Sequence, residues 1–158
     1  GITQLSNILR HTLTLEKRSL ISLEEELKLL RDYLNLEKIR LEERLNYEIN
    51  VTKSCLRYQL PPMLIQTLAE NAIKHGISKL IKGGNLIINS KSDDTFLIME
   101  IINSGQYEPG SLNLESASGF GIKNSIQRLQ FIFGEKASLE INNRNKNEVL
   151  TKLKIPKS

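Results

Sequence analysis

The chain has few of the residues that mark secreted, metal-binding or membrane-spanning proteins. Its 158 residues include one cysteine, Cys55, and no tryptophan. A lone cysteine excludes an internal disulfide and predicts a reducing compartment, and together with His11 and His75 it makes no zinc-ligand pattern. No apolar run approaches the ~20 residues that span a bilayer. Lys and Arg are interleaved with Glu at a net charge of +4, so neither nucleic acid nor a membrane is an expected partner.

Leucine and isoleucine must fill the core, and the 39% of hydrophobic residues suffices for one domain. Residues 2–17 are expected to be helical. A second helix begins at Ser22, which forms a capping box with Glu25, and residues 24–26 are expected to be cap and surface residues. This helix carries one apolar stripe of leucines and a second one made of Leu29, Tyr33 and Leu36. Two such faces pack on two surfaces, either within one fold or on the domain and a partner helix.

In the rest of the chain, segments in which apolar residues recur every two residues alternate with segments in which they recur every 3.6 residues. We expect a helix from the first turn at Pro61-Pro62 to Gly76, a long polar loop over 103–118 and a helix over 121–133. Strands are expected at 47–52, 86–88, 96–102, 137–141 and 149–155. Strands that are grouped rather than strictly alternating with helices predict an α+β fold, with helices on one face of a mixed sheet.

One side of the predicted helix at 61–76 is polar, with Thr67, Glu70, Asn71, Lys74 and His75 on one arc. The carboxamide oxygen of Asn71 is a hard ligand that suits Mg²⁺. Lys74 follows it within one turn and can reach a phosphate as a point charge. Taken alone, this segment fits an ordinary amphipathic helix with a solvated face equally well.

Two glycine-containing segments add weight to a nucleotide site. Gly119-Phe120-Gly121 precedes a predicted helix, and glycines there let the backbone approach phosphates near a helix N-terminus. Asn103-Ser104-Gly105 ends a predicted strand, where Asn103 can accept from an adenine amino group and Gly105 lets the base lie against the backbone. Each segment alone is also typical of a simple turn.

In order and spacing, the three segments resemble the N box and the two glycine boxes of histidine-kinase ATP-binding domains, which have a Bergerat-type two-layer α/β sandwich fold. The N-terminal part narrows the likeness to LytS/YehU-type sensor histidine kinases. The stretches similar to that family are 22–27, 33–34, 37–40, 60–66, 70–76, 121–124 and 128–129. The resemblance divides the chain into a partial dimerisation and phosphoacceptor helical region over 1–45 and an ATP-binding catalytic domain over 46–158.

The resemblance implies ATP and Mg²⁺ as cofactors. Asn71 would coordinate Mg²⁺, Lys74 would contact a phosphate and His75 would lie beside the nucleotide. Asn103 and Gly105 would border the adenine, and a lid over 106–118 would be mobile without nucleotide. The phosphates would be lined by residues at the start of the last helix, namely Gly119, Phe120, Gly121, Ile122 and Asn124.

The chain departs from the family at three places. Asn103 stands where the family has an aspartate that reads the adenine, and Tyr107 stands where it has a second glycine. The Asn-Pro-His-Phe type phosphoacceptor motif is absent, and His11 lies past its expected place. No catalytic residue is therefore assigned, and the phosphoacceptor histidine is expected upstream of Gly1.

The parent protein implied by the resemblance is a bacterial inner-membrane histidine kinase with a cytoplasmic kinase domain. It would form a homodimer, phosphorylate its own histidine and pass the phosphoryl group to an aspartate of a response regulator. Three other classes remain open. They are a pseudokinase that uses the fold as an interaction module, an ATP-hydrolysing domain similar to the gyrase and Hsp90 types, and an anti-sigma type serine kinase. The hydrolysing type would need a glutamate where Gln66 and Thr67 stand, and Glu70 points in a different direction.

Overall fold

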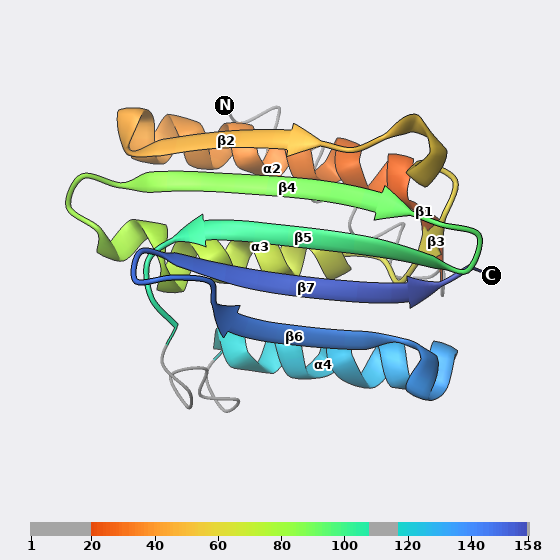
Figure 1. The fold of residues 1–158 in the computed structure, drawn as a ribbon. Helices are drawn as coiled ribbons and strands as arrows, with labels where there is room; N and C mark the ends of the chain where they lie inside the picture. The colour runs from red at the N-terminus through yellow and green to blue at the C-terminus, as the bar shows by residue number, and fades with distance from the viewer. Residues whose placement is uncertain (1–19, 108–116, 158) are drawn as a thin grey trace.

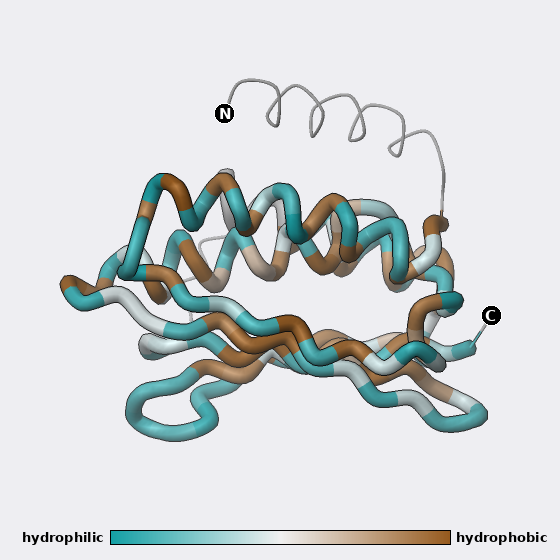
Figure 2. The backbone as a smooth tube through the Cα atoms, turned by 90° about the horizontal axis from the view of Figure 1, so that it is seen from above, coloured by the Kyte–Doolittle hydropathy of each residue, from teal (hydrophilic) through white to brown (hydrophobic). Residues whose placement is uncertain are grey.

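The computed structural model describes residues 20–107 and 117–157, without the side chains of residues 117–121. In these residues a mixed sheet has the strand order β2-β4-β5-β7-β6, in which only β2 and β4 are parallel. Figure 1 shows the helices behind the sheet, and Figure 2 shows them from above on one side of it. The strands are β2 (Leu45–Asn50), β4 (Gly84–Ser92), β5 (Phe96–Ser104), β6 (Ser138–Asn143) and β7 (Glu148–Pro156).

The helical layer consists of α2 (Leu23–Leu41), α3 (Leu64–His75) and α4 (Ala117–Phe133). Short 3-10 turns lie at Glu42–Arg44, Lys53–Cys55, Ile77–Lys79 and Gly134–Lys136. A separate two-stranded ladder pairs β1 (Ile21–Ser22) with β3 (Gln59–Leu60), which ties the start of α2 to the segment that leads into α3. None of the helices in the described ranges is long and apolar enough to cross a membrane.

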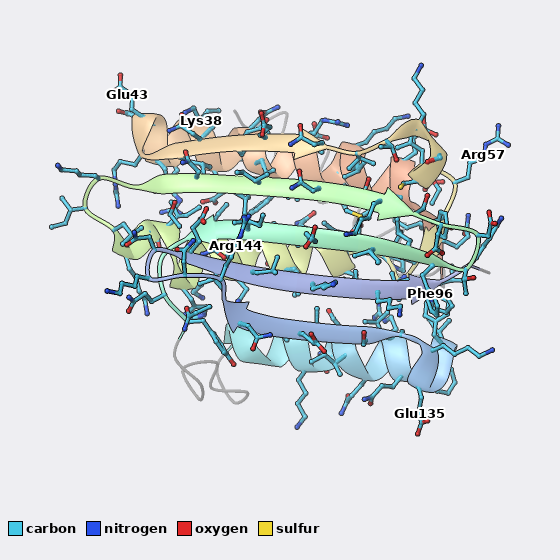
Figure 3. The ribbon with its side chains drawn as sticks, viewed as in Figure 1. Lys38, Glu43, Arg57, Phe96, Glu135 and Arg144 are labelled. Atoms are coloured by element: carbon cyan, nitrogen blue, oxygen red, sulfur yellow. The ribbon has the colours of Figure 1, made fainter. Side chains whose placement is uncertain are left out.

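The predicted start of α2 is confirmed, because the side chain of Ser22 accepts a hydrogen bond from the Glu25 amide at 3.2 Å. The leucine stripe of α2 is buried against the sheet and α3. Leu29, on the other face, is buried in a small cluster with Ile21 and partly buried Leu36 and Met63, so this stripe has contacts within the chain. Figure 3 labels Lys38 and Glu43 where α2 turns into β2, and there the Lys38 ammonium donates to the Leu45 carbonyl.

The side chains of β5 alternate between the helix layer and the open face of the sheet. Leu97, Met99 and Ile101 belong to the main core, and Asn103 follows them on the same side at the end of the strand. In the register of the sheet, Ile101 lies opposite Thr151 and Asn103 lies opposite Val149. The alternation therefore places two polar side chains, Asn103 and Thr151, on the face that the helices cover.

Several predicted boundaries differ from the structure. The helix predicted from Pro61 begins only at Leu64, because Met63 has a left-handed backbone with φ 70°. The strand predicted at 47–52 lies at Leu45–Asn50, and the last helix starts at Ala117 rather than 121. Strand β5 ends only at Ser104, so residues 103 and 104 of the predicted loop belong to the strand. The helix expected over 2–17, His11 and residues 108–116 of the lid lie outside the described residues.

The expectation that residues 24–26 are surface residues is wrong for Glu26, whose side chain is 0% exposed. Glu26 lies on the buried face of α2, one residue before Leu27. Its carboxylate accepts hydrogen bonds from backbone amides at the start of α3, which replace the water that the carboxylate loses.

Candidate functional site

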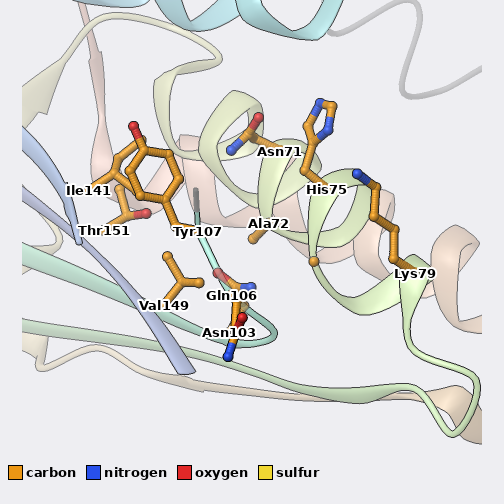
Figure 4. Close-up of a pocket in the computed structure, with 11 residues that line it drawn as sticks. Asn71, Ala72, His75, Lys79, Asn103, Gln106, Tyr107, Ile141, Val149 and Thr151 are labelled. Atoms are coloured by element: carbon orange, nitrogen blue, oxygen red, sulfur yellow. The ribbon is translucent and has the colours of Figure 1, made fainter. Parts of the chain in front are cut away.

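A pocket of about 200 Å³ lies between the C-terminal half of α3 and the ends of β5, β6 and β7. Figure 4 shows its lining, with Asn71 and His75 coming from the helix and Thr151 and Val149 from the sheet. The lining residues are Asn71, Ala72, His75, Gly76, Lys79, Asn103, Gln106, Tyr107, Ile141, Val149 and Thr151. Three of the residues predicted for a nucleotide site, Asn71, His75 and Asn103, therefore lie around one cavity.

Asn71 and His75 each contribute a buried polar atom that has no partner within the part of the chain that the structure describes. They are four residues apart on α3, so both lie on the same face of the helix. Among the described residues, no group hydrogen-bonds to the buried Oδ1 atom of Asn71 or to the buried Nε2 atom of His75. Buried polar atoms are almost always paired, so two orphaned atoms beside one cavity indicate a ligand that supplies their partners.

Asn103 reaches the pocket from the end of β5 and is 3% exposed. Its Nδ2 atom donates to the carbonyl oxygen of Ser104 at 3.0 Å, which leaves its Oδ1 atom as an acceptor. Thr151, on the neighbouring strand β7, is 5% exposed and lines the same pocket. A buried carboxamide and a buried hydroxyl on adjacent strands can hydrogen-bond a planar polar ring that enters between them.

Glycines at one end of the pocket allow two backbone segments to touch. A β-carbon on Gly105 would lie 3.2 Å from the α-carbon of Gly76, and Gly105 has φ +129°. The Gly105 amide donates to the Asn147 carbonyl at 2.9 Å. Gly105 itself does not line the pocket, so its small size serves the contact between the end of β5 and the end of α3.

The two lysines near the site have different positions. Lys74 is exposed and is not a lining residue, whereas Lys79, in the 3-10 turn after α3, lines the pocket. Burial lowers the pKa of His75, and the charges of Lys79 and Lys74 lower it further. The imidazole is therefore held neutral near pH 7, so that Nε2, to which no described residue hydrogen-bonds, can act as a donor or an acceptor, depending on the tautomer.

The segment that follows β5 is held against the turn between β6 and β7. The backbone amide of Tyr107 donates to Asn143 Oδ1 at 2.8 Å, and Asn143 Nδ2 donates back to the Tyr107 carbonyl at 2.7 Å. Gln106 Nε2 donates to the Lys146 carbonyl at 2.8 Å. These bonds fix Tyr107 beside the pocket, where the family was expected to have a glycine.

The predicted residues of the last helix lie elsewhere or are only partly described. Ile122 is 2% exposed in the core and Asn124 is exposed, and neither lines the pocket. Residues 119–121 belong to α4 instead of preceding it, and their side chains lie outside the described part. Sequence reasoning named Gln106 only as the first residue of the lid, and it assigned no pocket role to the lining residues Ala72, Gly76, Lys79, Ile141, Val149 and Thr151. Only the period-two pattern of the last strands pointed to the sheet residues among them.

Comparison with known proteins identifies related chains. A family model described as "Histidine kinase" matches residues 1–45. The sensor protein LytS of Staphylococcus saprophyticus is 32% identical over 149 residues, covering 89% of this chain and 25% of that protein. The sensor histidine kinase/phosphatase LytS of Staphylococcus aureus is 34% identical over 149 residues, covering 88% of this chain and 26% of that protein. The chain thus spans about a quarter of the length of these curated relatives.

Solved structures share the fold. The catalytic domain of the histidine kinase ThkA, in a nucleotide-free form, superimposes with a TM-score of 0.65 at 21% identity, covering 87% of this chain and 96% of that chain. ThkA in complex with the response regulator protein TrrA superimposes with a TM-score of 0.57 at 20% identity, covering 99% of this chain and 48% of that chain. The α+β sandwich predicted from the sequence is confirmed, and it is the fold of histidine kinase catalytic domains.

Proposed function

This chain belongs to the LytS-type sensor histidine kinases, and on that premise we propose that it holds the ATP from which a phosphoryl group passes to a histidine. The observation that carries the proposal is a pair of buried polar atoms, Asn71 Oδ1 and His75 Nε2, which have no partner among residues 20–107 and 117–157 and lie beside a pocket that Asn103 also lines. A nucleotide and its metal would supply the missing partners.

Asn71 is the residue that would hold Mg²⁺. Its Oδ1 atom is a hard oxygen ligand without a protein partner among the described residues, which fits an ion that binds few protein oxygens and keeps phosphate and water oxygens. When bound, Mg²⁺ neutralises charge on the phosphates. Lys79 lines the pocket, and Lys74 is an exposed residue of α3 between Asn71 and His75 in the sequence. Each lysine can therefore offer an ammonium group to a phosphate.

Asn103 and Thr151 would recognise the adenine. The pocket volume of about 200 Å³ is below the roughly 300–1,000 Å³ of sites that enclose a whole ligand, so it suits the base rather than all of ATP. The ribose and phosphates would lie toward the segment 106–118 and the start of α4, which carries Gly119, Phe120 and Gly121. In this proposal the segment acts as a lid, and Ile122 and Asn124 orient the helix start instead of lining the base.

The remaining steps concern parts of the protein beyond this pocket. We propose that residues 1–45 belong to the dimerisation and phosphoacceptor region and residues 46–158 to the catalytic domain. The accepting histidine, a second copy of the protein and a response regulator would complete the phosphorelay, on the cytoplasmic side of a membrane-bound parent. The complex of ThkA with TrrA supports a response regulator as partner.

Calorimetric titration of ATP with and without Mg²⁺ tests the proposal. The wild-type chain should bind ATP in a magnesium-dependent manner, and Asn71→Ala should lose the magnesium dependence. Asn142→Ala is a matched control, because Asn142 is an exposed carboxamide on β6 that does not line the pocket. Absence of binding by the folded wild-type chain would overturn the proposal in favour of a pseudokinase that serves as an interaction module.

A further inference from the structure

The buried carboxyl group of Glu26 connects the helices α2 and α3. Glu26 lies on α2 and is 0% exposed. Its Oε1 atom accepts from the Met63 amide at 2.9 Å, and its Oε2 atom accepts from the amides of Ile65 at 2.8 Å and Gln66 at 3.3 Å. A side chain of α2 therefore binds the N-terminus of α3, the helix that carries Asn71 and His75.

The start of α3 has no cap of its own. Its N-cap residue is Met63, which has φ 70° and forms no side-chain cap hydrogen bond. The first amides of a helix need acceptors, and a negative charge there is favoured by the helix dipole. Glu26, which lies 37 residues before Met63 in the sequence, supplies the acceptors, so the cap of α3 also fixes where α3 lies relative to α2.

Other contacts tie the same region together. The Leu23 amide at the start of α2 donates to the Tyr58 carbonyl at 2.9 Å, and the Glu24 amide donates to the Leu56 carbonyl at 3.1 Å. From the opposite side, Arg128 Nη1 on α4 donates to the Pro62 carbonyl at 3.3 Å. Three helices thus meet at the turn before α3, with the buried carboxyl group of Glu26 at that junction.

We propose that Glu26 is the positioning residue of the nucleotide pocket, holding α3 at the axial position and rotation that place Asn71 and His75 beside Asn103. This inference rests on the function proposed above. Asn71 lies about one and a half to two turns along the chain from the amides that Glu26 binds, and the helix transmits a shift along its axis with little loss because its backbone is hydrogen-bonded throughout. Displacements of about 1 Å at such a distance can cost a site roughly a hundredfold in rate.

Glu26 can be followed directly because its ionisation changes near neutral pH. Burial raises the pKa of Glu26 to about 7, against the opposing effect of its three backbone hydrogen bonds. The groups that face it are backbone amides of α3, and the charged side chain that reaches the same turn is Arg128 of α4. His75 also titrates, with a pKa that burial and the charges of Lys79 and Lys74 lower, so its own imidazole signals give the reference midpoint for the Glu26 step.

The first experiment follows the wild-type chain by NMR from pH 5 to pH 9 without nucleotide. We expect the Glu26 carboxyl carbon, the amides of Ile65 and Gln66 and the side-chain amide of Asn71 to share a midpoint near 7. An Asn71 signal that follows only the His75 midpoint would overturn the proposal. This measurement needs neither a variant that folds nor ATP binding, so it decides the positioning role even where the proposed function fails.

The second experiment compares the ATP affinity of Glu26→Gln with that of the wild-type chain in the presence of Mg²⁺. Glutamine keeps the shape but presents an N–H₂ group to backbone donors, so we expect roughly tenfold weaker binding. The ratio of the two affinities should change across pH 7, because only the wild type carries the carboxyl group that ionises there. The titrations of ATP and His75 occur in both proteins and cancel in the ratio. Glu24→Gln, which alters an exposed carboxylate on the same helix, should match the wild type. Equal affinities of a folded Glu26→Gln and the wild type would contradict the proposal.

Discussion

Gly76 and Asn103 are in such close contact at the edge of the pocket that a β-carbon on Gly76 would overlap the Nδ2 atom of Asn103. The same β-carbon would lie 2.7 Å from the carbonyl oxygen of Ala72. Gly76 ends α3 and Asn103 ends the core-facing side of β5, so this contact sets the separation between the helix and the sheet where the nucleotide is proposed to enter.

Gly76→Ala should therefore damage both the fold and the pocket. We expect the free energy of unfolding to fall by about 1–3 kcal/mol, as in other overpacked sites, and ATP binding to weaken because Asn103 is displaced. Denaturant titration and calorimetry measure the two effects. Gly134→Ala is the control, because Gly134 has φ +63° but no atom of the described residues lies within 4 Å of the added carbon. It should lose stability through backbone strain alone and keep its ATP affinity.

Asn103→Asp should raise affinity for ATP at the expense of stability. A carboxylate is a stronger acceptor for an adenine amino group than a carboxamide, so we expect tighter binding by about tenfold. The substitution also removes the donor that Asn103 offers to the Ser104 carbonyl and places a charge at a site that is 3% exposed. Parallel titrations with ATP and GTP test the role, since GTP lacks the amino group at that position. Equal gains for both nucleotides would contradict adenine recognition by residue 103.

The two lysines near the pocket make a matched pair for locating the phosphates. Lys79→Ala removes the ammonium group that lines the pocket, and Lys74→Ala removes an exposed one on α3. We expect Lys79→Ala to weaken ATP binding several-fold at low salt and less at high salt, where phosphate contacts are screened. A larger loss in Lys74→Ala would instead support the role predicted for Lys74 from the sequence.

His75 should titrate below its ordinary value. Burial and then the charges of Lys79 and Lys74 lower its pKa in the folded chain. The unfolded chain therefore binds the proton first, and stability from this group is present above about pH 6.5 and is lost as the pH falls further. Imidazole NMR signals measure the midpoint, which should rise in Lys79→Ala. An unchanged midpoint in that variant would place Lys79 farther from His75 than the structure does.

The stability of the chain should also fall as the pH rises through neutrality, because of Glu26. Its folded pKa of about 7 exceeds the value of 4.5 expected when unfolded. The favourable contribution is complete below pH 4.5 and is lost as the pH rises through 7, by up to about 3 kcal/mol. Denaturant titrations of the wild type and Glu26→Gln from pH 5 to pH 8 should diverge in that window. Parallel curves would contradict an abnormal ionisation of Glu26.

The local features of the chain were predictable because they depend on neighbouring residues. The cap of α2 by Ser22 follows from cap chemistry, and the strand β5 follows from a run of apolar residues. The start of α3 could not be predicted, because a proline pair also suits a first helical turn. In the structure Met63 has a left-handed backbone, and the helix begins after it. The amide of Met63 donates to Glu26, which is far away in the sequence. The polar stripe on α3 likewise gave Asn71 and His75 but did not separate them from Lys74, whose side chain leaves the same helix in a more exposed direction.

By itself the sequence determined the α+β class, the helix that carries Asn71 and His75, and the likeness to histidine kinases. These depend on periodicity and on short motifs, which are local. Only the tertiary structure decided that Thr151 and Lys79 join the pocket and that Gly105 packs on Gly76. It alone showed that the buried carboxyl group of Glu26 binds the start of α3. These are contacts between segments separated in the chain, and they arise when the sheet register and helix packing fix the positions of those segments.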